Sequence, residues 1–222
     1  MIDTILRVVE FVGVIAFSIS GAIIAIQKKT DIIGALIFAL LTSFGGGFIR
    51  DITLGITPRI LSLDNLSLCI VCLVIAGGCF SLAFVPKTAE LITKHSHNFI
   101  IELFDAIGLS VFCVLGIDVA IEVSGGANPL VLVFCGCITG VGGGMLRDIC
   151  SAEIPFILRK HIYLIPTLLG SLFYTFTYKF NHIASMLIAI GIIIVLRVLA
   201  ILFKWNLPIP KTEGESIKDN IK

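Results

Sequence analysis

The chain has 222 residues, of which 57% are hydrophobic and 14% are charged, and its mean hydropathy is +1.08. Soluble domains carry about a quarter of charged residues, so this chain has too few to cover a water-facing surface. The formal net charge of +1, without a basic tract, gives no sign of a nucleic-acid partner. The composition therefore excludes a soluble domain and predicts an all-α integral membrane protein.

Long apolar runs divide the chain into predicted membrane helices, because a helix needs about 20 apolar residues to cross a bilayer. The seven predicted spans cover, in chain order, residues 8–26, 32–54, 66–85, 99–121, 129–150, 162–180 and 183–203. Glycine triplets interrupt the second and fifth spans, and we expect both helices to be broken there. The predicted units are a first three-helix repeat with its loop at 1–94, a second, inverted repeat at 95–181, a seventh helix at 182–210, and a disordered cytoplasmic tail at 211–222.

The distribution of basic residues predicts the orientation of the chain, since lysine and arginine accumulate on the cytoplasmic side. Seven spans place the two termini on opposite sides of the membrane. Arg7, Arg50, Arg59 and Lys179 fall on the side of the N-terminus, and most of the other basic residues share a side with the C-terminus. We therefore expect the N-terminus outside and the C-terminus in the cytoplasm.

The first three predicted helices and the next three share a pattern that indicates an internal repeat. Helices one and four align at an offset of 95 residues, and helices two and five align at 97. The segments at 42–51 and 139–148 both read TxxGGGxxRD. Aligned positions in helices one and four are Glu10 with Asp105, Gly13 with Gly108, Phe17 with Phe112, and Gly21 with Gly116. Since each copy has an odd number of spans, the second copy is inserted upside down, as in many transport proteins.

The glycine triplets mark a candidate site for permeation. Each glycine costs a helix roughly 1 kcal/mol relative to alanine, and a break frees carbonyls that survive at membrane depth only inside protein or beside water. Both triplets lie near the midplane, where such carbonyls can replace part of a cation's hydration shell. An alternative is that the small residues serve close helix packing. The candidate pore residues are Thr42, Ser43, Gly45, Gly46, Gly47, Thr139, Gly142, Gly143 and Gly144.

Charged residues beyond each triplet form a second candidate group, for gating or ion pairing. Arg50 and Arg147 lie three residues past the last glycine, where a charge in the membrane is costly and by default functional. Asp51 and Asp148 follow them, but neighbouring helix positions do not face each other. The expected inter-helix ion pairs are therefore Glu10 with Arg50 and Asp105 with Arg147. The alternative is that both arginines anchor at lipid headgroups, as Arg197 in helix seven is expected to do by snorkelling.

The doubled TxxGGGxxRD segment and the stretch Ile-Pro-Phe-Ile-Leu-Arg at 154–159 resemble the bacterial glycine-transporter-domain or UPF0126 group, which is similar to the trimeric intracellular cation (TRIC) channels. The resemblance covers about residues 5–206. It implies a 3+3+1 inverted-repeat plan in a bacterial inner membrane, a homotrimer, and one pore per protomer lined by helices two and five. It also implies passage of potassium and sodium. The lysine-rich motif of animal TRIC channels is not readable here, so their lipid and voltage regulation is not carried over.

Other functional classes remain open at this stage. A secondary transporter of glycine or another small amino acid would use the same inverted repeats and broken helices. An enzyme is not expected, because no Lys-Ser or Lys-Thr follows the glycines to make a P-loop and no nucleophile or metal constellation is present. No cofactor is expected, and no metal beyond transient potassium and sodium. Asp118 and Glu122 form either an acidic mouth that attracts cations or a solvated helix end.

Overall fold

The computed structural model describes residues 2–85, 98–126, 128–159 and 162–205, and every regular element in these ranges is helical. The predicted tail at 211–222, with the loop that holds His95 and His97, lies outside them. Two single-turn 3₁₀ helices, η1 (Arg59–Leu61) and η2 (Leu63–Asn65), separate α2 from α3. The α-helices are α1 (Ile2–Gln27), α2 (Ile32–Thr53), α3 (Leu66–Leu82), α5 (Asn98–Ser124), α6 (Pro129–Cys150), α7 (Phe156–Arg159), α8 (Leu164–Thr177) and α9 (His182–Leu202).

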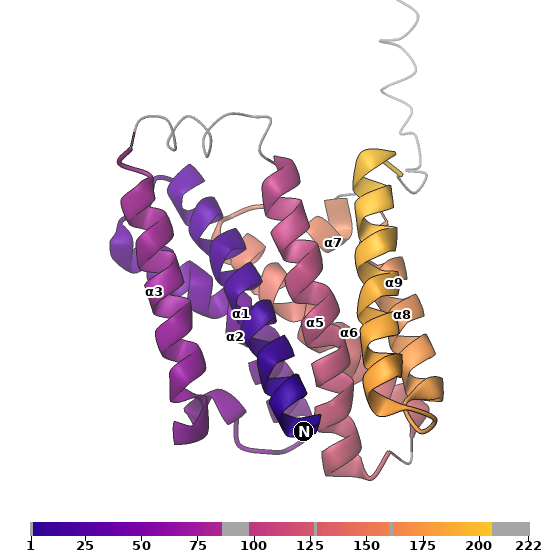
Figure 1. The fold of residues 1–222 in the computed structure, drawn as a ribbon. Helices are drawn as coiled ribbons and strands as arrows, with labels where there is room; N and C mark the ends of the chain where they lie inside the picture. Colours follow the sequence, from indigo (N-terminus) through magenta and orange to yellow (C-terminus); the bar gives the residue numbers. More distant parts are fainter. Residues whose placement is uncertain (1, 86–97, 127, 160–161, 206–222) are drawn as a thin grey trace, which may run out of the picture.

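The long helices form one bundle (Figure 1), in which α1 packs on α5 and α2 packs on α6. The helix α3 covers α1 and α2, whereas α8 and α9 pack against each other and against α5. In Figure 1, α1 and α5 run in opposite directions, and the N-terminus and the end of α9 lie at opposite ends of the bundle. Residues from both halves of the chain therefore meet along the bundle axis.

Side-chain caps explain where several helices begin. The Asp31 carboxylate accepts a hydrogen bond from the Gly34 amide, at 2.8 Å, and starts α2. Asn128 caps α6 in the same way and is followed by proline, whose fixed φ angle suits a first helical position. Asn181 accepts from the Ala184 amide, at 3.0 Å, and starts α9.

Six of the helices in the described ranges are long and apolar enough to cross a membrane: α1, α2, α3, α5, α6 and α9. The sixth predicted span forms α8, which has only 14 residues. At 1.5 Å per residue, α8 is about 21 Å long, shorter than the roughly 30 Å hydrocarbon layer. Outward-facing side chains such as Val74, Phe176 and Ile188 are large, apolar and exposed, as lipid contact requires.

The predicted breaks in the second and fifth helices are wrong. Both α2 and α6 are α-helical through their glycine triplets, at residues 45–47 and 142–144. The propensity cost of roughly 1 kcal/mol per glycine is outweighed by tertiary packing, because the triplets lie where α2 and α6 touch. The packing interpretation of the glycines describes this contact better than a break does.

Candidate functional site

The closest contact between α2 and α6 joins the two glycine triplets to the two threonines that precede them. A Cβ atom added to Gly46 would overlap the backbone carbonyl oxygen of Thr139. A Cβ added to Gly143 would overlap the carbonyl oxygen of Thr42. These positions are equivalent in the aligned repeats, so the contact is reciprocal. Only glycine allows the two backbones to approach this closely.

The threonine hydroxyls bond within their own helices. Thr42 Oγ1 donates to the Phe38 carbonyl oxygen at 2.6 Å, and Thr139 Oγ1 donates to the Cys135 carbonyl oxygen at 2.5 Å. Thr42 also packs against Gly21 of α1, as Thr139 packs against Gly116 of α5. The two threonines therefore fill equivalent notches between neighbouring helices.

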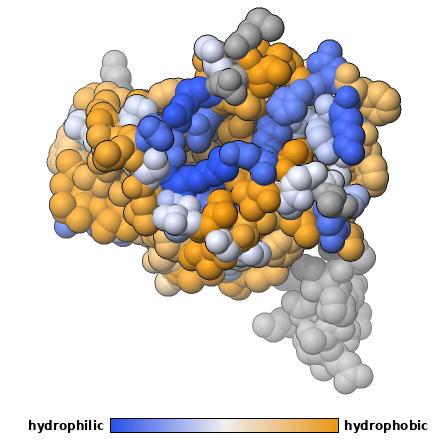
Figure 2. All heavy atoms as spheres, turned by 90° about the horizontal axis from the view of Figure 1, so that it is seen from below, coloured by the Kyte–Doolittle hydropathy of each residue, from blue (hydrophilic) through white to orange (hydrophobic). Residues whose placement is uncertain are grey.

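A water-accessible cavity of about 500 Å³ enters the bundle from the end that carries the N-terminus, and we call it the vestibule. Figure 2 shows this end, where hydrophilic side chains run across an otherwise apolar surface. The vestibule is lined by parts of α1, α2, α3, α5, η1 and η2, and it reaches Ser43 and Gly47. Ser43 lies deep in the bundle, with its hydroxyl 3.1 Å from that of Ser18. Of the predicted pore residues, these two line the vestibule, whereas Thr42, Gly45, Gly46, Thr139 and Gly142–144 do not.

The wall of the vestibule carries more carboxylates than guanidinium groups. Five acidic residues face three arginines there: Glu10, Asp51, Asp64, Asp118 and Glu122 against Arg7, Arg50 and Arg59. When all are ionised, the cavity has an excess of negative charge, which concentrates cations at its mouth. Asp118 and Glu122 carry part of this charge. They are the residues for which the sequence allowed either an acidic mouth or a solvated helix end.

The predicted ion pair between Glu10 and Arg50 is wrong. Arg50 folds back onto the next residue, and its Nη2 lies 2.6 Å from Asp51 Oδ1. Glu10 pairs instead with Arg7, one turn earlier on α1, at 3.2 Å. The rule that adjacent helix positions do not face each other fails here because the long arginine side chain turns back along the helix. The other oxygen of Asp51 accepts the backbone amide of Arg59 at 2.7 Å and fixes the following loop.

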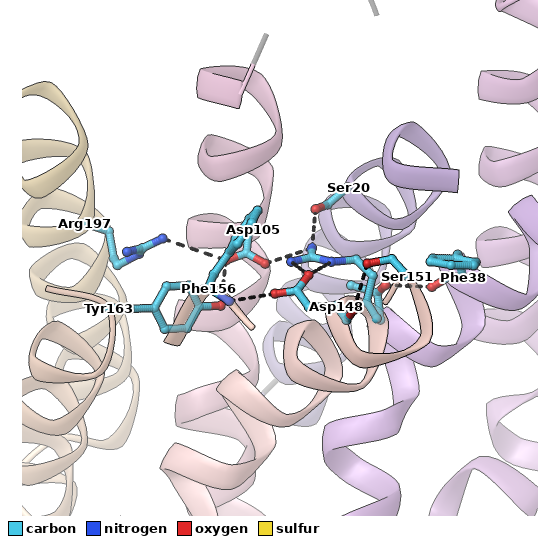
Figure 3. Close-up of polar contacts among 10 residues, drawn as sticks. Ser20, Phe38, Asp105, Asp148, Ser151, Phe156, Tyr163 and Arg197 are labelled. Carbon is cyan, nitrogen blue, oxygen red and sulfur yellow. Dashed lines mark hydrogen bonds and ion pairs between the residues drawn. The ribbon is translucent and has the colours of Figure 1, made fainter. Parts of the chain in front are cut away.

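The second repeat holds an equivalent Arg-Asp pair, fully buried and joined to α5 (Figure 3). Arg147 Nη1 lies 3.0 Å from Asp105 Oδ1, which is the inter-helix pair expected from the alignment. Arg147 also contacts Asp148 at 2.9 Å and donates to the Ser20 hydroxyl at 2.7 Å. Asp148 Oδ2 accepts a hydrogen bond from the Phe156 amide, eight residues later, at 2.8 Å. In the first repeat, Asp51 accepts one from the Arg59 amide at the same spacing.

Two further residues close this buried cluster, and the sequence did not indicate them. The Tyr163 hydroxyl donates to Asp105 Oδ2 at 2.7 Å. Arg197 of α9 lies with its guanidinium carbon 4.1 Å from the Tyr163 ring centroid, and its Nη2 is 3.9 Å from Asp105 Oδ2. Snorkelling of Arg197 was therefore a wrong prediction, since its side chain is 2% exposed. The sequence did contain one signal for this residue: Arg197 is a charged residue inside an otherwise apolar helix.

The two repeats also match in packing and loop geometry. Phe17 and Phe112, which are aligned positions, stack with ring centroids 5.3 Å apart. Gly55 and Ala152, also aligned, both have positive φ angles, of 70° and 55°, and each lies four residues after the aspartate of its Arg-Asp segment. In the part of the chain that the structure describes, no group of three or more His, Cys, Asp or Glu residues could hold a metal ion.

Comparison with known proteins places the chain in a family. The family model described as "Glycine transporter" matches twice, at residues 7–85 and 102–179. The UPF0126 inner membrane protein YadS of Escherichia coli is 32% identical over 206 residues, which cover 90% of this chain and 93% of that protein. The UPF0126 membrane protein of Vibrio cholerae is 30% identical over 94% of this chain and 84% of its own length.

Solved structures of prokaryotic TRIC channels have the same fold. The crystal structure of a prokaryotic TRIC channel in 0.5 M KCl is 36% identical and has a TM-score of 0.80, covering 92% of this chain and 99% of that one. The TRIC orthologue of Rhodobacter sphaeroides is 29% identical with a TM-score of 0.79, over 90% of this chain and 98% of its own. The chain therefore belongs to the glycine-transporter-domain, or UPF0126, family of bacterial membrane proteins and is a homologue of the prokaryotic TRIC channels.

Proposed function

We propose that this protein is a channel for monovalent cations, potassium and sodium, with one pore in each protomer. The observation that carries this proposal is the vestibule, a cavity of about 500 Å³ that reaches Ser43 and Gly47 of α2 and whose wall holds five carboxylates against three arginines. A cation drawn into it meets neutral oxygen ligands next to the glycine contact, as a weak transit site requires. The likeness to TRIC cation channels supports the same activity.

The path proposed here continues from the vestibule along the contact between α2 and α6 to the buried Arg147 cluster. Candidate pore residues on both helices would border it once α2 and α6 separate. In the present conformation Asp105 and Asp148 hold Arg147 in place, and the cluster closes the path at that end. Opening of the path would require the contacts of Arg147 with Asp105 and Asp148 to change together. We therefore propose the two Arg-Asp segments, at 50–51 and 147–148, as the gating elements.

The proposed fold plan is an inverted pair of three-helix repeats with α9 as a seventh span and α8 as a short sixth one. Reciprocal contacts between equivalent residues, such as Gly46 with Thr139 and Gly143 with Thr42, are what a two-fold axis between the repeats would produce. The family model also matches once per repeat. We further propose a homotrimer in the bacterial inner membrane with the N-terminus outside, as the distribution of basic residues favours.

Recording from purified protein in a planar bilayer tests the channel proposal. Under a potassium chloride gradient, unitary currents should reverse near the potassium equilibrium potential. Liposomes assayed for uptake of labelled glycine should show no saturable, gradient-driven transport. An electrically silent protein with saturable glycine uptake would instead establish the secondary transporter that the family's description suggests.

Neutralising the mouth of the vestibule should lower its conductance. In the double variant Asp64→Asn, Glu122→Gln, the cavity loses two negative charges, and we expect unitary potassium conductance to fall about threefold in dilute salt. The effect should disappear in about 1 M salt, where the Debye length is roughly 3 Å. Glu153→Gln, which removes a partly exposed carboxylate paired with Lys28, is the matched control and should leave conductance unchanged. Equal conductance in the double variant and the control would rule out this vestibule as the entrance.

A further inference from the structure

The first residue of α9 joins the wall of the vestibule through a cluster of three titratable side chains. Asp118 of α5 lines the vestibule and accepts a hydrogen bond from the Tyr174 hydroxyl of α8 at 2.5 Å. His182 Nε2 lies 3.1 Å from the same carboxylate oxygen, Oδ1, and 3.2 Å from the Tyr174 hydroxyl. Three helices therefore meet at one carboxylate that borders the proposed ion path.

The surroundings of His182 make Asp118 the dominant charge near its ring. Asp118 is 14% exposed and His182 is 30% exposed, so water screens their interaction only in part. The ring of Tyr178 packs next to that of Tyr174, with ring centroids 6.2 Å apart. The ammonium of Lys179 lies over the Tyr178 ring, 5.8 Å from its centroid. Glu122 follows Asp118 by one turn on α5 and is paired with Arg59 at 2.9 Å.

The geometry gives the two protonation states of His182 different electrostatic effects. A neutral ring that carries its proton on Nε2 can donate to Asp118 and leaves the negative charge of that carboxylate in place. Nδ1 has no hydrogen-bond partner among the described residues, so it is the ring nitrogen that would carry the second proton. A protonated ring forms an ion pair with Asp118 and cancels one of the carboxylate charges that the vestibule presents to cations. Histidine is the side chain that ordinarily changes charge between pH 5 and 8.

We propose that His182 is a proton-controlled regulator of conductance: its protonation on the vestibule side cancels the charge of Asp118 and lowers cation entry. This inference rests on the proposed channel function and adds a regulator to it. By Coulomb's law in water, removing one unit charge at a distance of about 8 Å changes the local cation concentration roughly twofold in dilute salt. The change should be small in about 1 M salt, because the Debye length falls to roughly 3 Å.

The test is unitary potassium conductance as the pH of the vestibule-side chamber is lowered from about 8 to 5.5 in dilute salt. The wild-type conductance should fall about twofold with acid. His182→Gln, which keeps a neutral hydrogen-bond donor, should hold the high value at every pH. Asp118→Asn, which lacks the carboxylate charge, should show the low value already at about pH 8, where the wild type still shows the high one. A triple variant of the other histidines, His95→Gln, His97→Gln and His161→Gln, is the matched control and should titrate like the wild type.

Each outcome separates this inference from the channel proposal. Wild-type currents that do not change with pH, or an acid response that survives in His182→Gln, would overturn the role of His182 and leave the channel intact. Loss of the acid response in the triple variant would assign it to another histidine. A wild type that is silent at every pH would overturn the channel proposal and this inference with it.

Discussion

Gly143→Ala is expected to lose about 3 kcal/mol of folding free energy, at the upper end of what overpacking costs. The added methyl group would overlap the Thr42 carbonyl oxygen, which is backbone and cannot rotate away. The two helices must therefore move apart, and the reciprocal contact at Gly46 is loosened with them. Reversible unfolding in mixed detergent micelles measures the loss.

Gly77→Ala provides the matched control for this substitution. Gly77 is also a helical glycine, but a Cβ there would meet nothing within 4 Å among the described residues. Alanine is the better helix former by roughly 1 kcal/mol, so this variant should be as stable as the wild type or slightly more stable. If Gly143→Ala and Gly77→Ala unfold alike, then α2 and α6 are not in backbone contact at the triplets.

Arg147→Met is expected to destabilise the protein by about 3–5 kcal/mol, the cost of breaking a buried ion pair by removing one partner. Arg147 is fully buried, and its loss leaves the carboxylates of Asp105 and Asp148 without their nearest positive charge. The additional change Asp105→Asn should recover part of the loss, because it removes one of the uncompensated charges. A double-mutant cycle on unfolding free energies measures the coupling between the two residues.

Lys28→Met is the matched control, because it removes one partner of an ion pair that is partly exposed rather than buried. Lys28 contacts Glu153 at 2.6 Å, but both side chains are about one-third exposed, so the pair is worth about 0–1 kcal/mol. If the Arg147 and Lys28 variants lost similar stability, the Arg147 cluster would be hydrated, and its role in closing the path would be excluded.

The positions of the long helices could be predicted from the sequence alone, because hydropathy and helix caps are local properties. Six of the predicted spans correspond to helices long enough to cross a membrane, and their bounds agree within a few residues, apart from α1, which begins earlier than predicted. The state of the glycine triplets could not be predicted in this way. Whether Gly46 and Gly143 break a helix or admit a neighbour depends on what lies beside them, and that is a tertiary property.

The charged cluster was predicted only in part, for a similar reason. Alignment of the repeats gave the pair of Asp105 with Arg147, since both residues lie at matched depths on neighbouring helices. The same argument failed for Glu10, because Arg7 is one turn away and competes for it. Arg197 was missed because α9 has no counterpart in the first repeat, so no aligned position indicated its direction.

The helix α9 also makes the two ends of a duplicated molecule unequal. Without it, the Arg-Asp segment of the second repeat would lack the guanidinium group of Arg197 that lies beside Asp105. The Arg-Asp segment of the first repeat faces the acidic vestibule, whereas that of the second is covered by Arg197 of α9 and by Tyr163, which precedes α8. If the two repeats are inverted copies, as proposed, α9 helps to give the two ends of the molecule different surroundings.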